Sequence, residues 1–158
     1  MSRRLNQDSL NIRSWEAEYA TKLSAFIPTP RGAKRFTNIY RLLKAPLDAD
    51  ELSVFEGQQA SPGEFRATML LLAILTGFPR LSPALFGAIT QQKPKTFSPR
   101  AFFADVAAHS VAGPDADRLQ SCLDPLLKKK IPDSGKPFVR WAPRVARFSF
   151  YTAKRWQT

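Results

Sequence analysis

The chain has 158 residues, of which 44% are hydrophobic and 23% charged, a size and composition that fit one globular domain and exclude wholesale disorder. Its 24 lysines and arginines outnumber its 13 aspartates and glutamates, which gives a net charge of +11. Such an excess favours anionic partners: nucleic acid, nucleotide phosphates, an acidic protein face or an anionic membrane surface.

Neither a membrane span nor a secretory leader is predicted. The longest apolar run, residues 69–75, is too short for a bilayer span, which needs roughly 20 residues. The sequence does not open with a basic segment followed by an apolar one. Cys122 is the only cysteine and cannot form an internal disulfide, so we expect a cytoplasmic protein.

The first predicted helix covers residues 15–27, after a segment, residues 1–14, that we expect to be flexible. Four large apolar side chains recur there at spacings of 4, 4 and 3, namely Trp15, Tyr19, Leu23 and Phe26. Side chains at these spacings lie on one face of an α-helix.

A hydroxyl residue directly before a proline marks four expected helix starts. The pairs are Thr29-Pro30, Ser61-Pro62, Ser82-Pro83 and Ser98-Pro99. Proline loses no hydrogen bond at the first helical position, and the hydroxyl before it can accept an N–H of the first turn.

The helix that follows Thr29 is predicted to have one basic face and one apolar face. At 100° per residue, an arc of about 120° holds the polar side chains Arg31, Lys34, Arg35, Asn38 and Arg41. The opposite face holds Ala33, Phe36, Ile39, Tyr40 and Leu43. Arg31 and Lys34 lie at the amino-terminal end, where exposed cations oppose the helix dipole by roughly 0.3–1 kcal/mol each. This arrangement favours phosphate recognition, although an ordinary solvated basic face has the same periodicity.

The most apolar segment, residues 65–76, is predicted to be a buried central helix, because it is apolar on every side. Ser61 and Glu64 stand before it with the spacing of a capping box, and Gly77 follows it. The other expected helices cover residues 83–90, 99–108 and 115–129. The expected loops cover residues 46–60, 91–97 and 131–137. We expect the last helix to break at Pro125, with Asp124 capping its second piece.

The fold class is therefore all-α: a compact multi-helix domain, residues 1–158, around the buried helix at residues 65–76. Residues 134–158 form a basic-aromatic tail. Its apolar side chains fit a helix face, yet residues 148–152 could equally form a short strand, so a C-terminal β-hairpin stays open.

The tail mixes cations with aromatic rings, and the candidate contact residues are Arg140, Trp141, Arg144, Arg147, Lys154 and Arg155. This mixture suits single-stranded nucleic acid, where cations follow phosphates and rings stack on bases. Equally, Trp141 and Phe148 could belong to the core. Residues 1–44 and residues 134–158 each carry six more basic than acidic side chains, and they would form one anion-attracting surface if they converge in space.

The string Thr-Pro-Arg-Gly-Ala-Lys-Arg-Phe-Thr-Asn-Ile-Tyr-Arg-Leu-Leu at residues 29–43 resembles the C-terminal helical part of KAP-like P-loop NTPases. These are large bacterial ATPases related to the AAA+ and STAND groups, some implicated in defence against phage. In that family a Ser/Thr-Pro-Arg-x-x-Lys-Arg-Phe-x-Asn helix follows the nucleotide-binding core and forms part of a lid. Residues 65–76 and 141–150 also look similar to the tail of such proteins, so the resemblance covers about half of the chain in three patches.

The resemblance implies that Arg31 matches the lid arginine that senses the γ-phosphate. It also implies a supporting role for Lys34 and Arg35 and an orienting role for Asn38. A guanidinium suits this task because it stays charged and offers a planar fork to phosphate oxygens. The sequence departs from the family in having no G-x-x-x-x-G-K-[ST] motif, so we expect no ATP hydrolysis by this chain alone. ATP and Mg²⁺ are expected only with a P-loop core, in the same or another polypeptide.

Other candidate sites are weaker, and we expect neither a catalytic residue nor a metal site. His109 is the only histidine, and Cys122 lies among leucines like a small core residue. The acidic groups Asp48, Asp50 and Glu51 and the pair Asp115 and Asp117 fit a loop and a helix start, respectively. Lys128, Lys129 and Lys130 end a predicted helix, where cations are stabilised by the dipole.

Two functions follow from these observations. The first is a non-catalytic helical region of a KAP-like P-loop NTPase, which contributes a sensor arginine and couples nucleotide state to an effector or partner surface. The alternative is a self-sufficient nucleic-acid-binding module that uses the two basic ends.

Overall fold

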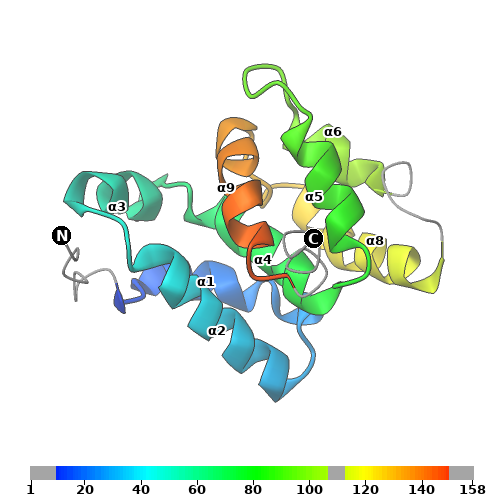
Figure 1. The fold of residues 1–158 in the computed structure, drawn as a ribbon, viewed down its shortest axis with the longest axis horizontal. Helices are drawn as coiled ribbons and strands as arrows, with labels where there is room; N and C mark the ends of the chain where they lie inside the picture. Colours follow the sequence, from blue (N-terminus) through cyan, green and yellow to red (C-terminus); the bar gives the residue numbers. More distant parts are fainter. Residues whose placement is uncertain (1–9, 107–112, 150–158) are drawn as a thin grey trace, which may run out of the picture.

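The computed structural model describes residues 10–106 and 113–149, and this part of the chain is mainly helical, as predicted (Figure 1). In chain order the elements are α1 (Ser14–Thr21), the 3₁₀ turn η2 (Ser24–Phe26), α2 (Pro30–Lys44), α3 (Ala49–Glu56), β1 (Gly57–Gln58), β2 (Ser61–Pro62), α4 (Phe65–Gly77), α5 (Ser82–Thr90), α6 (Pro99–Ala104), α8 (Pro114–Leu127) and α9 (Lys136–Ala146). None of the helices in these residues is long and apolar enough to cross a membrane.

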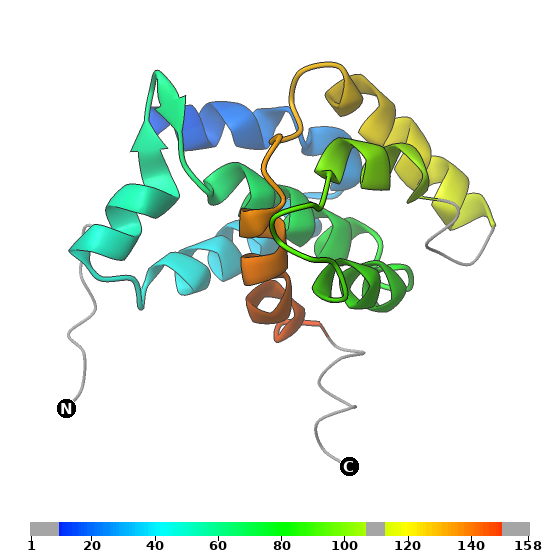
Figure 2. The ribbon, with the colours of Figure 1, turned by 90° about the horizontal axis from the view of Figure 1, so that it is seen from above.

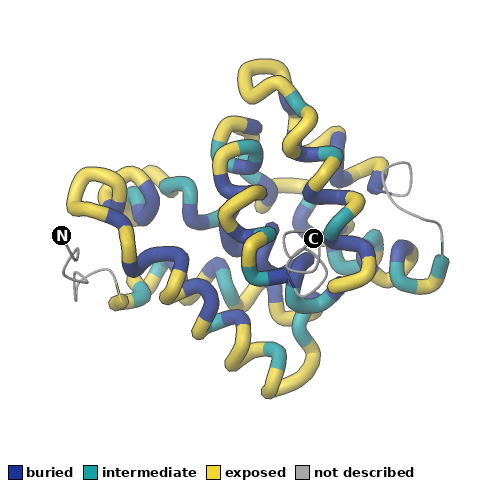
Figure 3. Tube along the Cα trace, viewed as in Figure 1, coloured by how far each residue is buried: buried dark blue, intermediate teal, exposed yellow. Residues whose placement is uncertain are grey.

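Helix α4 is the centre of the fold, which confirms the predicted buried helix. Every residue from Met69 to Leu75 is buried, so this helix has no solvent-facing side over two turns. Helices α9, α2 and α1 pack directly against it, and α5 packs against α9. Figure 2 shows α4 enclosed by these helices, and Figure 3 shows the buried positions gathered along it.

The first helix is shorter than predicted. It ends at Thr21, and the chain continues into the turn η2 instead of one helix over residues 15–27. The turn brings the Phe26 carbonyl against Gly77, where a Cβ atom would lie only 2.0 Å from that oxygen. Because a 3₁₀ turn repeats every three residues, Leu23 and Phe26 stay on the buried side that Tyr19 begins.

The region predicted as a loop, residues 46–60, contains helix α3 and strand β1. Asp48 caps α3, because its Oδ1 accepts the Glu51 N–H at 2.8 Å. This aspartate, followed three residues later by a glutamate, is itself a helix-start pattern that could have predicted α3. The helix ends at Glu56, and the next residue, Gly57, has a φ of 63°, a conformation that glycine adopts without strain.

The pair Ser61-Pro62 does not start a helix, so that prediction is wrong. It forms strand β2, which pairs antiparallel with β1 in the register Gly57 to Pro62 and Gln58 to Ser61. Helix α4 begins at Phe65 without a side-chain cap. The Glu64 carboxylate, which a capping box would have turned back to the backbone, instead contacts Arg140 and Trp141 on α9.

The other hydroxyl-proline pairs are closer to the prediction. The Thr29 and Ser98 hydroxyls accept first-turn N–H groups and cap α2 and α6. Helix α5 begins at Ser82 itself, whose hydroxyl donates to the Pro79 carbonyl instead of capping.

Helix α8 runs through Pro125 without the predicted break. Pro125 is exposed and lies in the last turn, where the Ser121 carbonyl that loses its helical donor can be hydrated. Asp124 accepts a hydrogen bond from Gln120 Nε2 at 2.9 Å instead of capping a second helix. His109 and the proposed hairpin residues 150–152 lie outside the described residues.

Candidate functional site

Helix α2 presents the five predicted polar side chains on its exposed face. Thr29 fixes the start of the helix, because its Oγ1 accepts the Gly32 N–H at 3.1 Å. Gly32 lies close to the Ile27 and Thr29 side chains, and a Cβ there would approach Ile27 Cγ2 to 2.8 Å. The residues on the solvent side, all exposed, are Arg31, Lys34, Arg35, Asn38 and Arg41.

The opposite face of α2 fixes the orientation of this row. Its buried side chains are Phe36, Ile39, Tyr40 and Leu43, as the periodicity predicted, whereas Ala33 is exposed. Phe36 and Tyr40 stack with their rings parallel, and Tyr40 also contacts Phe55 of α3. The helix is therefore held against the core on one side, and its cations project from a fixed support.

No carboxylate among residues 10–106 and 113–149 pairs with the cations of the exposed α2 face. Arg35 has one internal contact, because its Nη2 donates to the Phe148 carbonyl at 3.2 Å. This bond ties α2 to the segment after α9, and its acceptor is a neutral carbonyl that does not compensate the guanidinium charge. The exposed face of α2 is thus a row of positive charge over roughly 15 Å from Arg31 to Arg41, at 1.5 Å per residue.

Lys44, the last residue of α2, is not part of this surface. It is completely buried, and its Nζ lies 2.9 Å from Glu16 Oε1 and 3.1 Å from Glu56 Oε2. The Asn11 carbonyl accepts a further hydrogen bond from Nζ at 2.7 Å. Arg13 Nε lies 3.0 Å from the same Glu56 Oε2 atom that Lys44 contacts. We call these five residues the buried ionic cluster.

The buried ionic cluster is structural. Burial raises the pKa of Glu16 above its ordinary value, and the hydrogen bonds from Tyr40 and Lys44 oppose that rise. Burial and the neighbouring Glu16 also raise the pKa of Tyr40 well above 10.0. The cluster fastens residues 11–16 to α2 and α3, a role that no local sequence pattern indicated because its members are far apart in the chain.

Helix α9 holds most of the tail residues proposed from the sequence, but it does not leave all of them available. Trp141 is only 2% exposed, and its Nε1 donates to Glu64 Oε2 at 2.8 Å. Arg140 forms an ion pair with the other oxygen of Glu64. A base cannot stack on Trp141 in this conformation, because the indole belongs to the core, so that prediction is wrong. Arg140 anchors α9 to the residue before α4.

Arg144 and Arg147 are the exposed cations at the carboxyl-terminal end of α9. The Arg144 guanidinium lies 4.7 Å from the centre of the Trp141 ring, so the indole supports it. Arg144 and Arg147 also border a groove between α2 and α9. The predicted residues Lys154 and Arg155 lie outside the described part of the chain.

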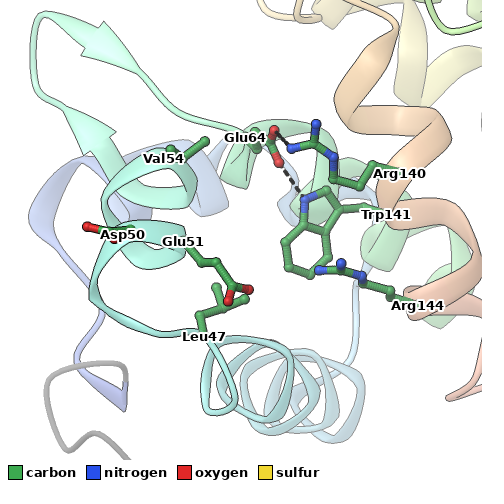
Figure 4. A pocket seen from close by; sticks show the side chains of 8 residues that line it. All are labelled: Leu47, Asp50, Glu51, Val54, Glu64, Arg140, Trp141 and Arg144. Atoms are coloured by element: carbon green, nitrogen blue, oxygen red, sulfur yellow. Dashed lines mark hydrogen bonds and ion pairs between the residues drawn. The ribbon is translucent and has the colours of Figure 1, made fainter.

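A second hollow, the α3–α9 cleft, has a volume of about 390 Å³. In Figure 4 the Glu64 carboxylate holds Arg140 and the Trp141 indole at one end, while Arg144 points into the cleft beside the indole. Glu51 reaches in from α3 on the opposite side. The polar end at Glu64 is thus already held by α9, and the cleft shares Leu47, Glu51 and Arg144 with the groove between α2 and α9.

Comparison with known proteins gives no match. Neither a family model, nor a curated protein, nor a solved structure matches this chain. The resemblance to KAP-like NTPases therefore stays a prediction from the sequence.

The positions of the remaining candidate residues are explained by the fold. Asp48, Asp50 and Glu51 lie at the start of α3, and Asp115 and Asp117 in the first turn of α8, where carboxylates are stabilised by the helix dipole. The partly buried Cys122 thiol donates to the Ala25 carbonyl, and burial raises its pKa, which disfavours the reactive thiolate. Within the described residues, no group of three or more His, Cys, Asp or Glu side chains could hold a metal ion.

Proposed function

We propose that this chain is a non-catalytic helical region of a KAP-like P-loop NTPase, in which Arg31 contacts the phosphates of a nucleotide held by a P-loop core. The core lies in the same or another polypeptide. The observation that carries the proposal is the exposed α2 face, with its cations in a row and no carboxylate partner in residues 10–106 and 113–149.

Stability alone does not account for this arrangement. An exposed cation near the amino-terminal end of a helix is disfavoured by roughly 0.3–1 kcal/mol, and Arg31 occupies the second position of α2. An anion placed there would be attracted both by the helix dipole and by the guanidinium. A phosphate contact therefore explains Arg31 better than a role in folding does.

Coupling to a partner surface follows from how α2 is anchored. The helix packs against α4 through its apolar face, and Arg35 bonds to the carbonyl of Phe148 beyond α9. Movement of α2 on a change of nucleotide state would shift both of these neighbours. We propose that this connection transmits the nucleotide state to an effector surface.

The test is ATP hydrolysis by the chain together with the product of the gene upstream. Arg31→Ala should lower turnover by on the order of 100-fold, as expected when a positioned phosphate contact is lost. Lys95→Ala is the matched control, because this exposed lysine lies in the loop between α5 and α6, far from α2 (Figure 1). Equal turnover in the two variants, or an upstream product without a P-loop, would refute the proposal.

A second function is favoured because the described parts of the two basic ends, residues 10–44 and 134–149, meet in space. Arg35 on α2 bonds to the carbonyl of Phe148, and Phe148 lines the same groove as Arg144 and Arg147. The exposed cations of α2 are therefore close to those at the end of α9. Together these cations form a surface that is longer than the triphosphate of one nucleotide and suits a chain of phosphates. We therefore propose single-stranded nucleic acid as the alternative partner. Its affinity should fall steeply between 50 and 200 mM salt, and no binding at low salt would exclude it.

A further inference from the structure

The groove between α2 and α9 has the size of a small-molecule site. Its volume is about 450 Å³, within the range of roughly 300–1,000 Å³ that is typical of such sites. One wall comes from the carboxyl-terminal part of α2 and the turn after it, and the other from the end of α9. The residues used below are Leu42, Leu47, Glu51, Arg144, Arg147 and Phe148.

One side of this groove is apolar although it faces solvent. Leu42 is 58% exposed, whereas the other large apolar side chains of α2 are buried. Leu47 and the partly buried Phe148 continue the apolar surface inside the groove. A flat, uncharged group would bury this surface at little cost, whereas a fully charged ligand would not.

The other side of the groove is cationic and partly preorganised. Arg144 rests against the Trp141 indole, which Glu64 fixes in turn, so the guanidinium is held at the groove edge. Arg147 follows three residues later and is exposed, and neither arginine has an ion pair with a carboxylate among the residues described. Glu51 lines the same groove and can accept hydrogen bonds from the amino groups of a base.

From this combination we propose that the α2–α9 groove binds one nucleotide unit, with its base against Leu42 and its phosphate on Arg144 and Arg147. The proposal rests on the alternative function given above and gives it a location. A neighbouring phosphate of the same strand would then follow the row from Arg41 to Arg31. The shared chemistry is that of a nucleoside phosphate, and its source is either single-stranded nucleic acid or a free nucleotide.

The test is fluorescence anisotropy of a labelled 12-nucleotide oligo(dC) with the full chain at several salt concentrations. The double substitution R144A/R147A should weaken binding by on the order of tenfold and lower the slope of log affinity against log salt by roughly 1.4, the value for two contacts to a single strand. The control K93A/K95A removes the same charge from the exposed α5–α6 loop and should leave both quantities nearly unchanged. Circular dichroism melting of each variant establishes that it is folded.

Two further measurements separate the base contact from the phosphate contact. Leu42→Ala should weaken binding of the oligo(dC) by about threefold and leave binding of an abasic strand of equal length unchanged. Displacement of the strand by free CMP at millimolar concentration would assign the site to free nucleotides, and no displacement would assign it to nucleic acid. The groove proposal is overturned if R144A/R147A and K93A/K95A act alike or if the abasic strand binds as tightly as oligo(dC). If the wild-type chain binds no strand at low salt, the alternative function fails as well.

Discussion

Lys44→Met is the substitution whose effect follows most directly from the structure. It replaces the central cation of the buried ionic cluster by an apolar side chain of similar length. The carboxylates of Glu16 and Glu56, which lie 2.9 Å and 3.1 Å from Nζ, then remain in place without this partner. Arg13 cannot replace it, because its side chain is 45% exposed and, of these two carboxylates, pairs with that of Glu56.

The magnitude follows from that geometry. Removing one partner of a buried ion pair typically costs about 3–5 kcal/mol, because the remaining charge stays desolvated. A domain of this size has a free energy of unfolding of roughly 5–15 kcal/mol, so the substitution should remove a large part of it. At about 2–4 °C per kcal/mol, we expect the melting temperature to fall by roughly 6–20 °C.

The assay is urea unfolding followed by circular dichroism at 222 nm. Lys34→Met is the matched control, because Lys34 is exposed on the same helix, and its effect should stay within about 0.5 kcal/mol. The triple variant K44M/E16Q/E56Q should recover much of the loss, since it removes the uncompensated charges. A cost below about 1 kcal/mol for Lys44→Met would show that water reaches the cluster and would refute this reasoning.

Two further predictions concern packing and pH. Gly77→Ala should lower the free energy of unfolding by about 1–3 kcal/mol, because the new Cβ would lie 2.0 Å from the Phe26 carbonyl oxygen. Gly87→Ala should raise it by about 0.5–1 kcal/mol, because a Cβ there meets nothing within 4 Å outside its own stretch of helix. Thermal melts of the two variants beside the wild type check both predictions. Burial raises the pKa values of Tyr19 and Tyr40 above 10.0, so the native state keeps protons that the unfolded state loses. Stability should therefore be constant with respect to these groups below pH 10 and fall as the pH rises further. Tyrosinate absorbance from these two residues should appear only with unfolding, and its appearance in the native protein would contradict the prediction.

The sequence was sufficient where a pattern is local. The apolar run at residues 69–75 and the two faces of α2 are set by the helical repeat, so their large buried side chains were predicted correctly. Of the residues predicted for the apolar face of α2, the small Ala33 is exposed instead. The pair Ser61-Pro62 also forms a local pattern, but long-range contacts override it. Glu64 is used by Arg140 and Trp141, which lie more than 70 residues away, and the helix starts without its cap.

The candidate site shows the same division. The row on α2 follows from periodicity, but its meeting with Arg144 and Arg147 depends on how α9 packs against α4 and α5. The sequence pattern around Trp141 is the same for a tryptophan that stacks on a base and for one that fills the core. Only the tertiary structure separates these roles, because the indole lies between Phe55 and Glu64.

Arg31→Glu would distinguish a functional from a structural role of the exposed α2 face. Among residues 10–106 and 113–149, Arg31 forms no ion pair with a carboxylate, so its replacement breaks no ion pair in this part of the chain. A glutamate at the second position of α2 would be stabilised by the positive end of the helix dipole and would reduce the net positive charge of the protein. We expect a gain of about 0.3–1 kcal/mol in the free energy of unfolding, together with loss of the phosphate-dependent activity. Urea unfolding measures the first quantity, and ATP turnover with the P-loop partner the second. A variant that is less stable than the wild type would mean that Arg31 supports the fold, and the functional reading of this helix end would then be wrong.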